Sequence, residues 1–200
     1  MLSDNLVRVR RQIAQACQRC GRDPSSITLV AVTKGVGAGT IQEAISLGLR
    51  EFGENRVQEA GEKQNALGSG FGDQARGPQP TAQPATAIAK GGPGSPERVR
   101  WHMVGHLQRN KAKDAAALFQ VIHSVDSVEL AEALDRQGAR HRVSAIEVFV
   151  QVNLSGEATR FGCRQRDVER LAQDITGYPH LRLSGLMALA PYAEDSEQSR

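Results

Sequence analysis

Lys34 is the side chain in this sequence whose position most favours covalent chemistry. It follows the apolar run 27–33 (ITLVAVT), which is typical of a buried parallel strand. α/β folds place their sites at the carboxyl ends of such strands. A neutral lysine amine attacks aldehydes, and burial favours the neutral form because it disfavours the charged one. The alternative is a lysine that simply extends into solvent where the strand ends, and position alone favours that alternative.

Asn55 is a second candidate, in the segment 52–59 (FGENRVQE), which is expected to be a short strand that runs into a helix. Its amide can bond an oxygen or imine of a ring ligand, or it can cap the helix that follows. The residues alone favour the cap. We expect Glu54 and Glu59 to be solvated or paired with Arg56.

Histidines and cysteines supply weaker candidates. His102 and His106 have the i, i+4 spacing of a zinc site on a helix, but residues 103–105 are expected to be strand, which separates the two rings. Cys17 and Cys20 form a CxxC without a second pair, so ordinary thiols at a helix end explain them better than a redox or metal site. We therefore predict no metal site.

Met187 lies in the segment 181–190 (LRLSGLMALA), which is expected to put small and soft side chains inside the fold. The thioether either contacts a ligand ring or fills the core, and core filling is the usual role of methionine.

The elements that position these residues alternate between short β-branched runs and segments with helical spacing, which predicts βα units and a parallel sheet. A closed (β/α)8 TIM-type barrel needs eight units, and this chain offers about six. An open, doubly wound α/β sheet is the alternative. The expected strands are 27–34, 51–55, 101–105, 121–126, 146–153 and 183–189.

Length and composition indicate one domain over residues 1–200. Residues 68–98, rich in Gly, Pro, Ala, Gln and Ser, are expected to form a flexible low-complexity insertion. No apolar run is long enough to span a membrane, no signal peptide is recognisable, and the 3 cysteines suit a reducing compartment, so we expect a cytoplasmic protein. Its net charge of +3 is scattered and aromatic residues make up only 4%, which argues against nucleic-acid binding.

Taken together, several segments resemble the YggS/PROSC family of pyridoxal phosphate homeostasis proteins, in the family's order and over most of the chain outside the insertion. These segments are LVAVTK, FGENRVQE, WHMVGHLQRNK, HSVDS, VQVNLSGE with the following FGC, and LRLSGLM.

The resemblance implies a barrel like the N-terminal domain of alanine racemase, incomplete here, with pyridoxal 5′-phosphate attached as a Schiff base to Lys34. Asn55 and Met187 then become expected cofactor contacts, with no catalytic residue assigned. Family members are regarded as carriers or regulators of pyridoxal phosphate without established catalysis. We expect a monomer.

The sequence departs from the family pattern after Tyr192, where members continue through two further strands that cradle the cofactor phosphate. Two alternatives therefore stay open. One is a truncated fragment that does not bind the cofactor. The other is an enzyme of racemase or decarboxylase type, which requires an acid or base opposite Lys34, and the 2 tyrosines, Tyr178 and Tyr192, lie in no recognisable catalytic motif.

Overall fold

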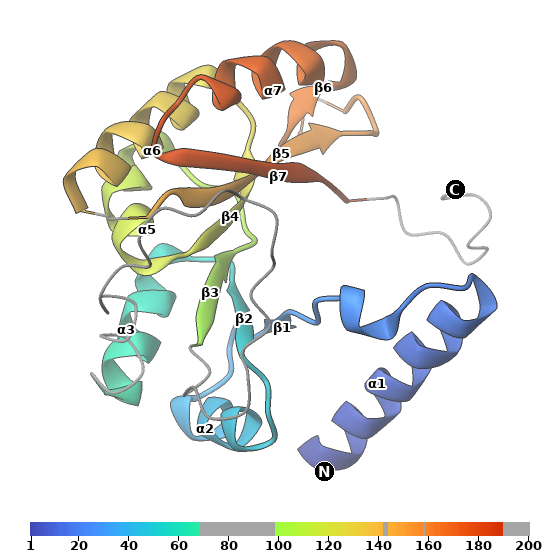
Figure 1. Ribbon diagram of the computed structural model, residues 1–200. Coiled ribbons are helices and arrows are strands. Elements are labelled where there is room, and N and C mark those ends of the chain that lie inside the picture. The colour runs from blue at the N-terminus through green and yellow to red at the C-terminus, as the bar shows by residue number, and fades with distance from the viewer. Residues whose placement is uncertain (69–98, 142–143, 158, 190–200) are drawn as a thin grey trace.

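The structure is a computed structural model that describes residues 1–68, 99–141, 144–157 and 159–189 (Figure 1). The expected insertion at 68–98 lies, apart from Gly68, outside these residues. The helices are α1 Leu2–Arg19, α2 Ala38–Ser46, α3 Val57–Leu67, α5 Ala112–Leu118, α6 Val128–His141 and α7 Val168–Thr176, with short 3-10 turns at Pro24–Ser26, Arg109–Lys111 and Gln165–Asp167. The strands are β1 Ala31–Val32, β2 Glu51–Glu54, β3 Arg100–Met103, β4 Val121–Val125, β5 Ile146–Asn153, β6 Cys163–Arg164 and β7 Leu181–Ala188.

All strand pairs among the described residues are parallel, and a helix follows β1, β2, β3 and β4 before the next strand. The sheet runs β1-β2-β3-β4-β5, after which β5 pairs with β7 along most of its length and with the short β6 near its carboxyl end. Among the described residues β1 and β7 do not pair with each other, so the sheet is curved but not closed. Six of the seven strands match the expected ones, and β6 was not predicted.

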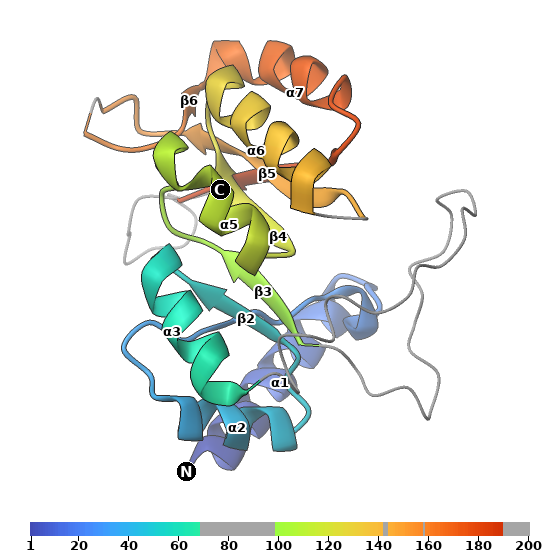
Figure 2. The same cartoon turned by 90° about the vertical axis from the view of Figure 1, so that its left-hand side faces the viewer.

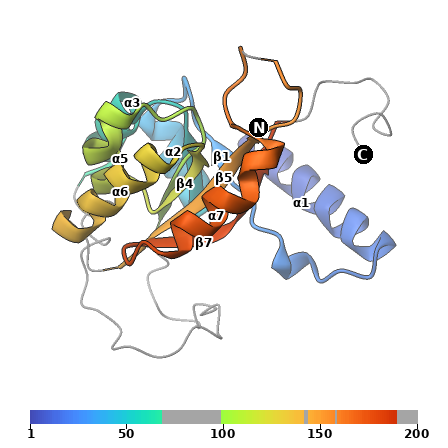
Figure 3. The ribbon, with the colours of Figure 1, turned by 90° about the horizontal axis from the view of Figure 1, so that it is seen from above.

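The helices that connect the strands cover one side of the sheet. Figure 2 shows α3, α5 and α6 in front of the strands, α7 above them and α1 behind, and Figure 3 shows α3, α5 and α6 on the opposite side of the strands from α1. A doubly wound sheet would place its connecting helices on both faces. The arrangement is therefore that of an incomplete (β/α) barrel, with an outer face toward the helices and an inner face away from them.

The core lies between the outer face of the sheet and the helices. Its central side chains are fully buried, and Phe52 on β2 contacts Trp101 on β3 with ring centroids 5.7 Å apart. Burial of each such side chain contributes roughly 1.5–3 kcal/mol. Ile41 and Ala60 bring α2 and α3 onto the same core, which fixes the helices that flank the first two strands.

One strand is much shorter than expected. The segment 27–34 was predicted to be a strand throughout, but only Ala31–Val32 pairs with β2, and Pro24–Ser26 forms a 3-10 turn instead. The expected burial of this run is also wrong, since Thr33 is its one buried residue and Val32 is 49% exposed. An apolar run favours a strand, but strand pairing also needs a neighbour with matching register. Here β2 supplies partners for two residues only.

Candidate functional site

Lys34 lies in a tight turn directly after β1. The amide of Val36 donates to the carbonyl of Thr33 over 2.9 Å, and Gly35 between them has a φ of 70°. A positive φ at the third residue is the arrangement of a type II turn, and glycine adopts it without a Cβ clash. Lys34 was expected at the carboxyl end of a parallel strand, and it lies there. Its side chain is exposed, so the burial that would favour the neutral amine is not found at this position, and in this respect the lysine matches the solvent-exposed alternative.

Behind the turn, on the helix side of the sheet, lies a buried ion pair. Lys63 on α3 donates from Nζ to Glu54 Oε1 and to the Thr33 carbonyl, each over 2.6 Å. The Thr33 hydroxyl donates to the same Glu54 oxygen over 2.5 Å. Glu54 is completely buried, and its other oxygen, Oε2, has no hydrogen-bond partner in the described part of the chain.

The expectation that Glu54 is solvated or paired with Arg56 is therefore wrong. Its partner is Lys63, nine residues further on. Arg56 instead pairs with Glu59, over 3.5 Å and mostly in solvent. The sequence does contain a signal for Lys63: the spacing places it on the same face of α3 as Ala60 and Leu67, which are both buried. A lysine on an apolar helix face needs a buried partner.

Asn55 follows β2 as Lys34 follows β1, and the two strands are neighbours. Val32 pairs with Gly53 on the inner face, so two residues further along each chain, Lys34 and Asn55 leave their strands on the same side. The capping alternative for Asn55 is wrong, because α3 begins at Val57 with Arg56 in the N-cap position.

The backbone of Asn55 is held against Gly105, which follows β3. A Cβ added to Gly105 would lie 2.3 Å from the Asn55 carbonyl oxygen and 2.8 Å from its Cα. The amide of Val104 also donates to the Glu54 carbonyl over 2.9 Å. The glycine therefore allows the ends of β2 and β3 to meet at the position where Asn55 leaves the strand.

Met187 lies on β7 at the other edge of the sheet. It is half-buried, near the carboxyl end of the strand, and pairs in register with Gln151 on β5. Pairing across the sheet puts Gln151 and Met187 on the inner face, the same face as Gly53. The structure thus brings Lys34 and Asn55 onto adjacent strands, with Met187 on the same face but at the far edge.

Toward the amino ends of the strands, the inner face carries a layer of charged and titratable side chains. His102 Nε2 lies 2.5 Å from Glu51 Oε2, and His102 Nδ1 lies 2.8 Å from His123 Nε2. Burial, followed by the neighbouring His102, lowers the pKa of His123 to about 4. His123 also stacks on Phe149, with ring centroids 4.7 Å apart. The sequence analysis named His102 but not His123, its partner on the next strand.

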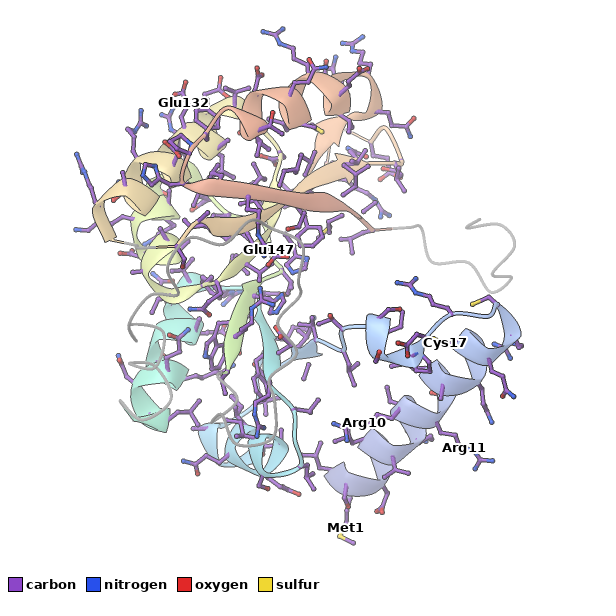
Figure 4. All side chains as sticks on the ribbon, in the orientation of Figure 1. Met1, Arg10, Arg11, Cys17, Glu132 and Glu147 are labelled. Atoms are coloured by element: carbon purple, nitrogen blue, oxygen red, sulfur yellow. The ribbon has the colours of Figure 1, made fainter. Side chains whose placement is uncertain are left out.

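Glu147, labelled near the centre of Figure 4, joins three strands in this layer. It accepts from Arg100 on β3 over 2.7 Å and from Arg182 on β7 over 2.6 Å. Burial raises the pKa of Glu147, but the Ser184 hydroxyl and the two guanidinium groups outweigh it and hold that pKa below its ordinary value. Within this layer His102 lies level with Gly53 and Val32, two residues before Lys34, and Glu147 lies nearer the amino ends of the strands.

His106 does not share a site with His102. It lies after β3, stacks on Phe161 with ring centroids 3.7 Å apart, and has its Nδ1 3.7 Å from Asp126 Oδ2. Within the described ranges, no group of three or more His, Cys, Asp and Glu side chains has an arrangement that could hold a metal ion. The three cysteines, Cys17, Cys20 and Cys163, are free thiols.

Two cavities flank the sheet. One, of about 220 Å³, lies at the carboxyl end of β5 between Gln151, Phe161 and Leu189. The other, of about 360 Å³, lies near the amino end of β1 and is lined by Arg10, Arg50 and Glu51 among others. Figure 4 shows Arg10 on the side of α1 that faces the sheet. Neither cavity is lined by Lys34, Asn55 or Met187.

This geometry suits capture of an aldehyde. Among the described residues, no hydrogen bond or ion pair engages the Lys34 side chain, and it is open to solvent. The inner face beside it offers an amide at Asn55. A lysine with these surroundings can form an imine with a carbonyl ligand that lies on the inner face of the sheet.

Comparison with known proteins gives a consistent result. The model of the family described as alanine racemase, N-terminal domain, matches residues 5–200. A pyridoxal phosphate homeostasis protein of Pseudomonas aeruginosa is 35% identical over 198 residues, which cover 98% of this chain and 74% of that protein.

Two solved structures are similar in fold. PipY of Synechococcus elongatus, whose structure was solved with PLP bound, is 31% identical, with a TM-score of 0.67 over 93% of this chain and 74% of PipY. An alanine racemase of Clostridium difficile, in complex with cycloserine, is 14% identical, with a TM-score of 0.52 over 84% of this chain and 39% of the racemase. At that identity the racemase supports the fold alone.

Proposed function

We propose that this chain, which belongs to the alanine racemase N-terminal domain family together with the pyridoxal phosphate homeostasis proteins, binds pyridoxal 5′-phosphate as a Schiff base on Lys34. Its role is then to hold or deliver the cofactor in the intracellular balance of pyridoxal phosphate. The observation that carries the proposal is the position of Lys34, exposed in a turn at the carboxyl end of β1.

The lysine and its neighbour on the next strand fit the cofactor in two respects. The cofactor supplies an aldehyde, and condensation with the lysine amine forms a C=N bond in place of C=O and releases water. Asn55, on the neighbouring strand, provides an amide for the phenolic oxygen or the imine nitrogen. Met187 lies on the same face but at the far edge of the sheet, so a contact between its thioether and the ring stays a prediction. PipY, solved with PLP bound, is a relative of this chain.

The proposal includes no catalytic turnover. A racemase or decarboxylase needs an acid or base opposite Lys34. Tyr178, the described tyrosine, lies just before β7 and therefore at the amino ends of the strands, the end opposite Lys34. Burial, followed by Glu132 and Asp174, raises its pKa further above the ordinary value, so an even smaller fraction of it is phenolate near neutral pH and available to act as a base.

The decisive experiment is an absorbance titration of the purified protein with pyridoxal phosphate, followed by borohydride reduction and peptide mapping. We expect a saturable imine band and a label on Lys34. The Lys34→Ala variant should lose both, whereas Lys113→Ala, which removes an exposed lysine of α5, should keep both. An equal label on Lys63, Lys111 and Lys113 would contradict the proposal and favour a fragment without a specific site.

Turnover is tested separately. The loaded protein, incubated with single L-amino acids, should produce no D-enantiomer and no amine. Production of either that disappears in Lys34→Ala would show that the chain is an enzyme. Transfer of the cofactor to an apo form of a pyridoxal phosphate-dependent enzyme would support delivery as well as storage.

We further propose that residues 1–200 fold as one domain and that the chain is a cytoplasmic monomer that binds no nucleic acid. No helix in the described part of the chain is both long and apolar enough to cross a membrane. One cooperative melting transition and a monomer mass by light scattering are the expected results. Two resolved melting transitions would refute the single domain, and a dimer mass would refute the monomer.

A further inference from the structure

We infer that Glu54 and Lys63 are positioning residues, which fix the turn that carries Lys34 and so set the rate at which Lys34 reacts with the cofactor aldehyde. The inference rests on the proposed attachment of the cofactor to Lys34. It concerns a second layer of residues, on the helix side of the sheet, that makes no contact with a ligand on the inner face.

Backbone pairing alone holds the turn weakly. β1 contributes Ala31 and Val32 to the sheet, and beyond them the amide of Thr33 donates to the Gly53 carbonyl over 2.8 Å. β1 is also the edge strand of the sheet, so it has a strand partner on one side only among the described residues. Such a short edge strand frays readily unless side chains hold its end.

Two bonds between Thr33 and the Glu54–Lys63 pair, together with the bond within the pair, hold the end of the strand. Nζ of Lys63 donates to the Thr33 carbonyl over 2.6 Å and to Glu54 Oε1 over 2.6 Å, and the Thr33 hydroxyl donates to Glu54 Oε1 over 2.5 Å. These bonds tie the end of β1 both to β2, which carries Glu54, and to α3, which carries Lys63. Bonds that involve a charged group are stronger than neutral ones.

The bond to the Thr33 carbonyl acts directly on Lys34. That carbonyl belongs to the same planar peptide group as the Lys34 amide. A donor that fixes the oxygen therefore fixes the direction in which the Lys34 Cα leaves the strand. Without Lys63 the carbonyl keeps, among the described residues, the turn bond from Val36 alone, and the peptide group is held less firmly.

Burial makes the pair effective. The Glu54 side chain has no exposed surface, and the Lys63 side chain is 13% exposed. Solvent screening is weak there, so the pair holds its geometry in a way that a surface pair does not. The exposed pair Arg56–Glu59 on the same helix, 3.5 Å apart, provides the natural contrast.

The experiment measures the rate of imine formation, by absorbance and by borohydride labelling of Lys34, well below the melting temperature. Lys63→Met should slow the reaction by about tenfold, the effect of losing a hydrogen bond to a charged donor. Glu54→Gln should slow it less, because the amide oxygen still accepts from Thr33. Glu59→Gln, the matched control on α3, should react at the rate of the unaltered chain.

Two further arms keep the outcomes distinct. If Lys63→Met does not fold, the double variant Glu54→Gln with Lys63→Met takes its place, since it leaves no buried charge without a partner, and the same slow rate is expected. A folded variant without Lys63 that labels Lys34 as fast as the unaltered chain overturns the inference. An unaltered chain that does not label Lys34 overturns the proposed function instead.

Discussion

Replacing Gly105 with alanine would place a methyl group where the backbone of Asn55 already lies. The added Cβ would be 2.3 Å from the Asn55 carbonyl oxygen, 2.8 Å from its Cα and 2.9 Å from its carbonyl carbon. All three are backbone atoms at the end of a strand, so no side-chain rotation can relieve the contact. Gly105 does not have a positive φ, so the effect is purely steric.

The magnitude follows from how far the two strand ends must move. A methyl carbon this close to a non-bonded oxygen must move away by about 1 Å to reach ordinary van der Waals contact. Overpacking of that kind costs about 1–3 kcal/mol of stability. A domain of this size loses about 2–4 °C of melting temperature per kcal/mol. We therefore expect Gly105→Ala to lower Tm by roughly 2–12 °C and, because Asn55 moves with its backbone, to weaken cofactor binding.

Thermal and urea unfolding, followed by circular dichroism, measure the first effect, and the absorbance titration measures the second. Gly39→Ala is the matched control, since its Cβ would meet nothing within 4 Å and it lies inside α2. There alanine should stabilise the chain by about 0.4–1 kcal/mol. Equal stability of the Gly105→Ala variant and the unaltered chain would refute the reasoning that Gly105 is needed for the close approach of β2 and β3.

Three further predictions concern other positions. Lys34→Ala should change the free energy of unfolding by less than about 0.5 kcal/mol, since the side chain is exposed, and a larger loss in urea melts would show a structural role for the lysine. Burial and His102 lower the pKa of His123 in the folded protein to about 4, whereas its pKa in the unfolded chain is near 6.5. The stability that comes from the neutral ring is therefore fully present above pH 6.5, and it is lost as the pH falls from 6.5 toward 4. After allowance for solvent screening, His123→Gln should reduce the fall in stability between pH 7 and 4 by about 1–2 kcal/mol, and an unchanged urea-derived profile would contradict this. Gly162→Ala should lower the free energy of unfolding by about 1–3 kcal/mol, because φ is 118° there and the new Cβ would lie 2.6 Å from the Asn153 amide nitrogen. Gly156→Ala, where φ is positive but the new Cβ meets nothing within 4 Å, should lower it by less in the same urea melts.

The location of Lys34 and Asn55 was accessible to sequence reasoning because both follow runs with clear strand character. In a parallel sheet, the residues that follow neighbouring strands meet at one edge, so predicting the strands suffices to place these two side chains. The strand over residues 146–153 was predicted to the residue, since its alternating pattern and its length agree.

The buried partners of the site were not accessible in the same way. Glu54 was expected in solvent because a carboxylate rarely lies in a core. Its burial depends on Lys63, and that pairing depends on the angle at which α3 crosses β2. His123 was missed for a similar reason, because its contact with His102 depends on the register between β3 and β4. The local sequence pattern determines neither the angle at which α3 crosses β2 nor the register between β3 and β4.

The shortness of β1 also bears on how a bound molecule could leave. Hydrogen exchange commonly shows that weakly paired edge segments open with a smaller free energy than the whole domain. The turn that carries Lys34 directly follows such an edge segment, β1, while β2 to β5 form the continuous centre of the sheet. Opening of this one segment would release the turn that carries Lys34 from its strand and helix partners while the rest of the fold stays protected. Release would then be governed by a local equilibrium, independent of the stability of the domain as a whole.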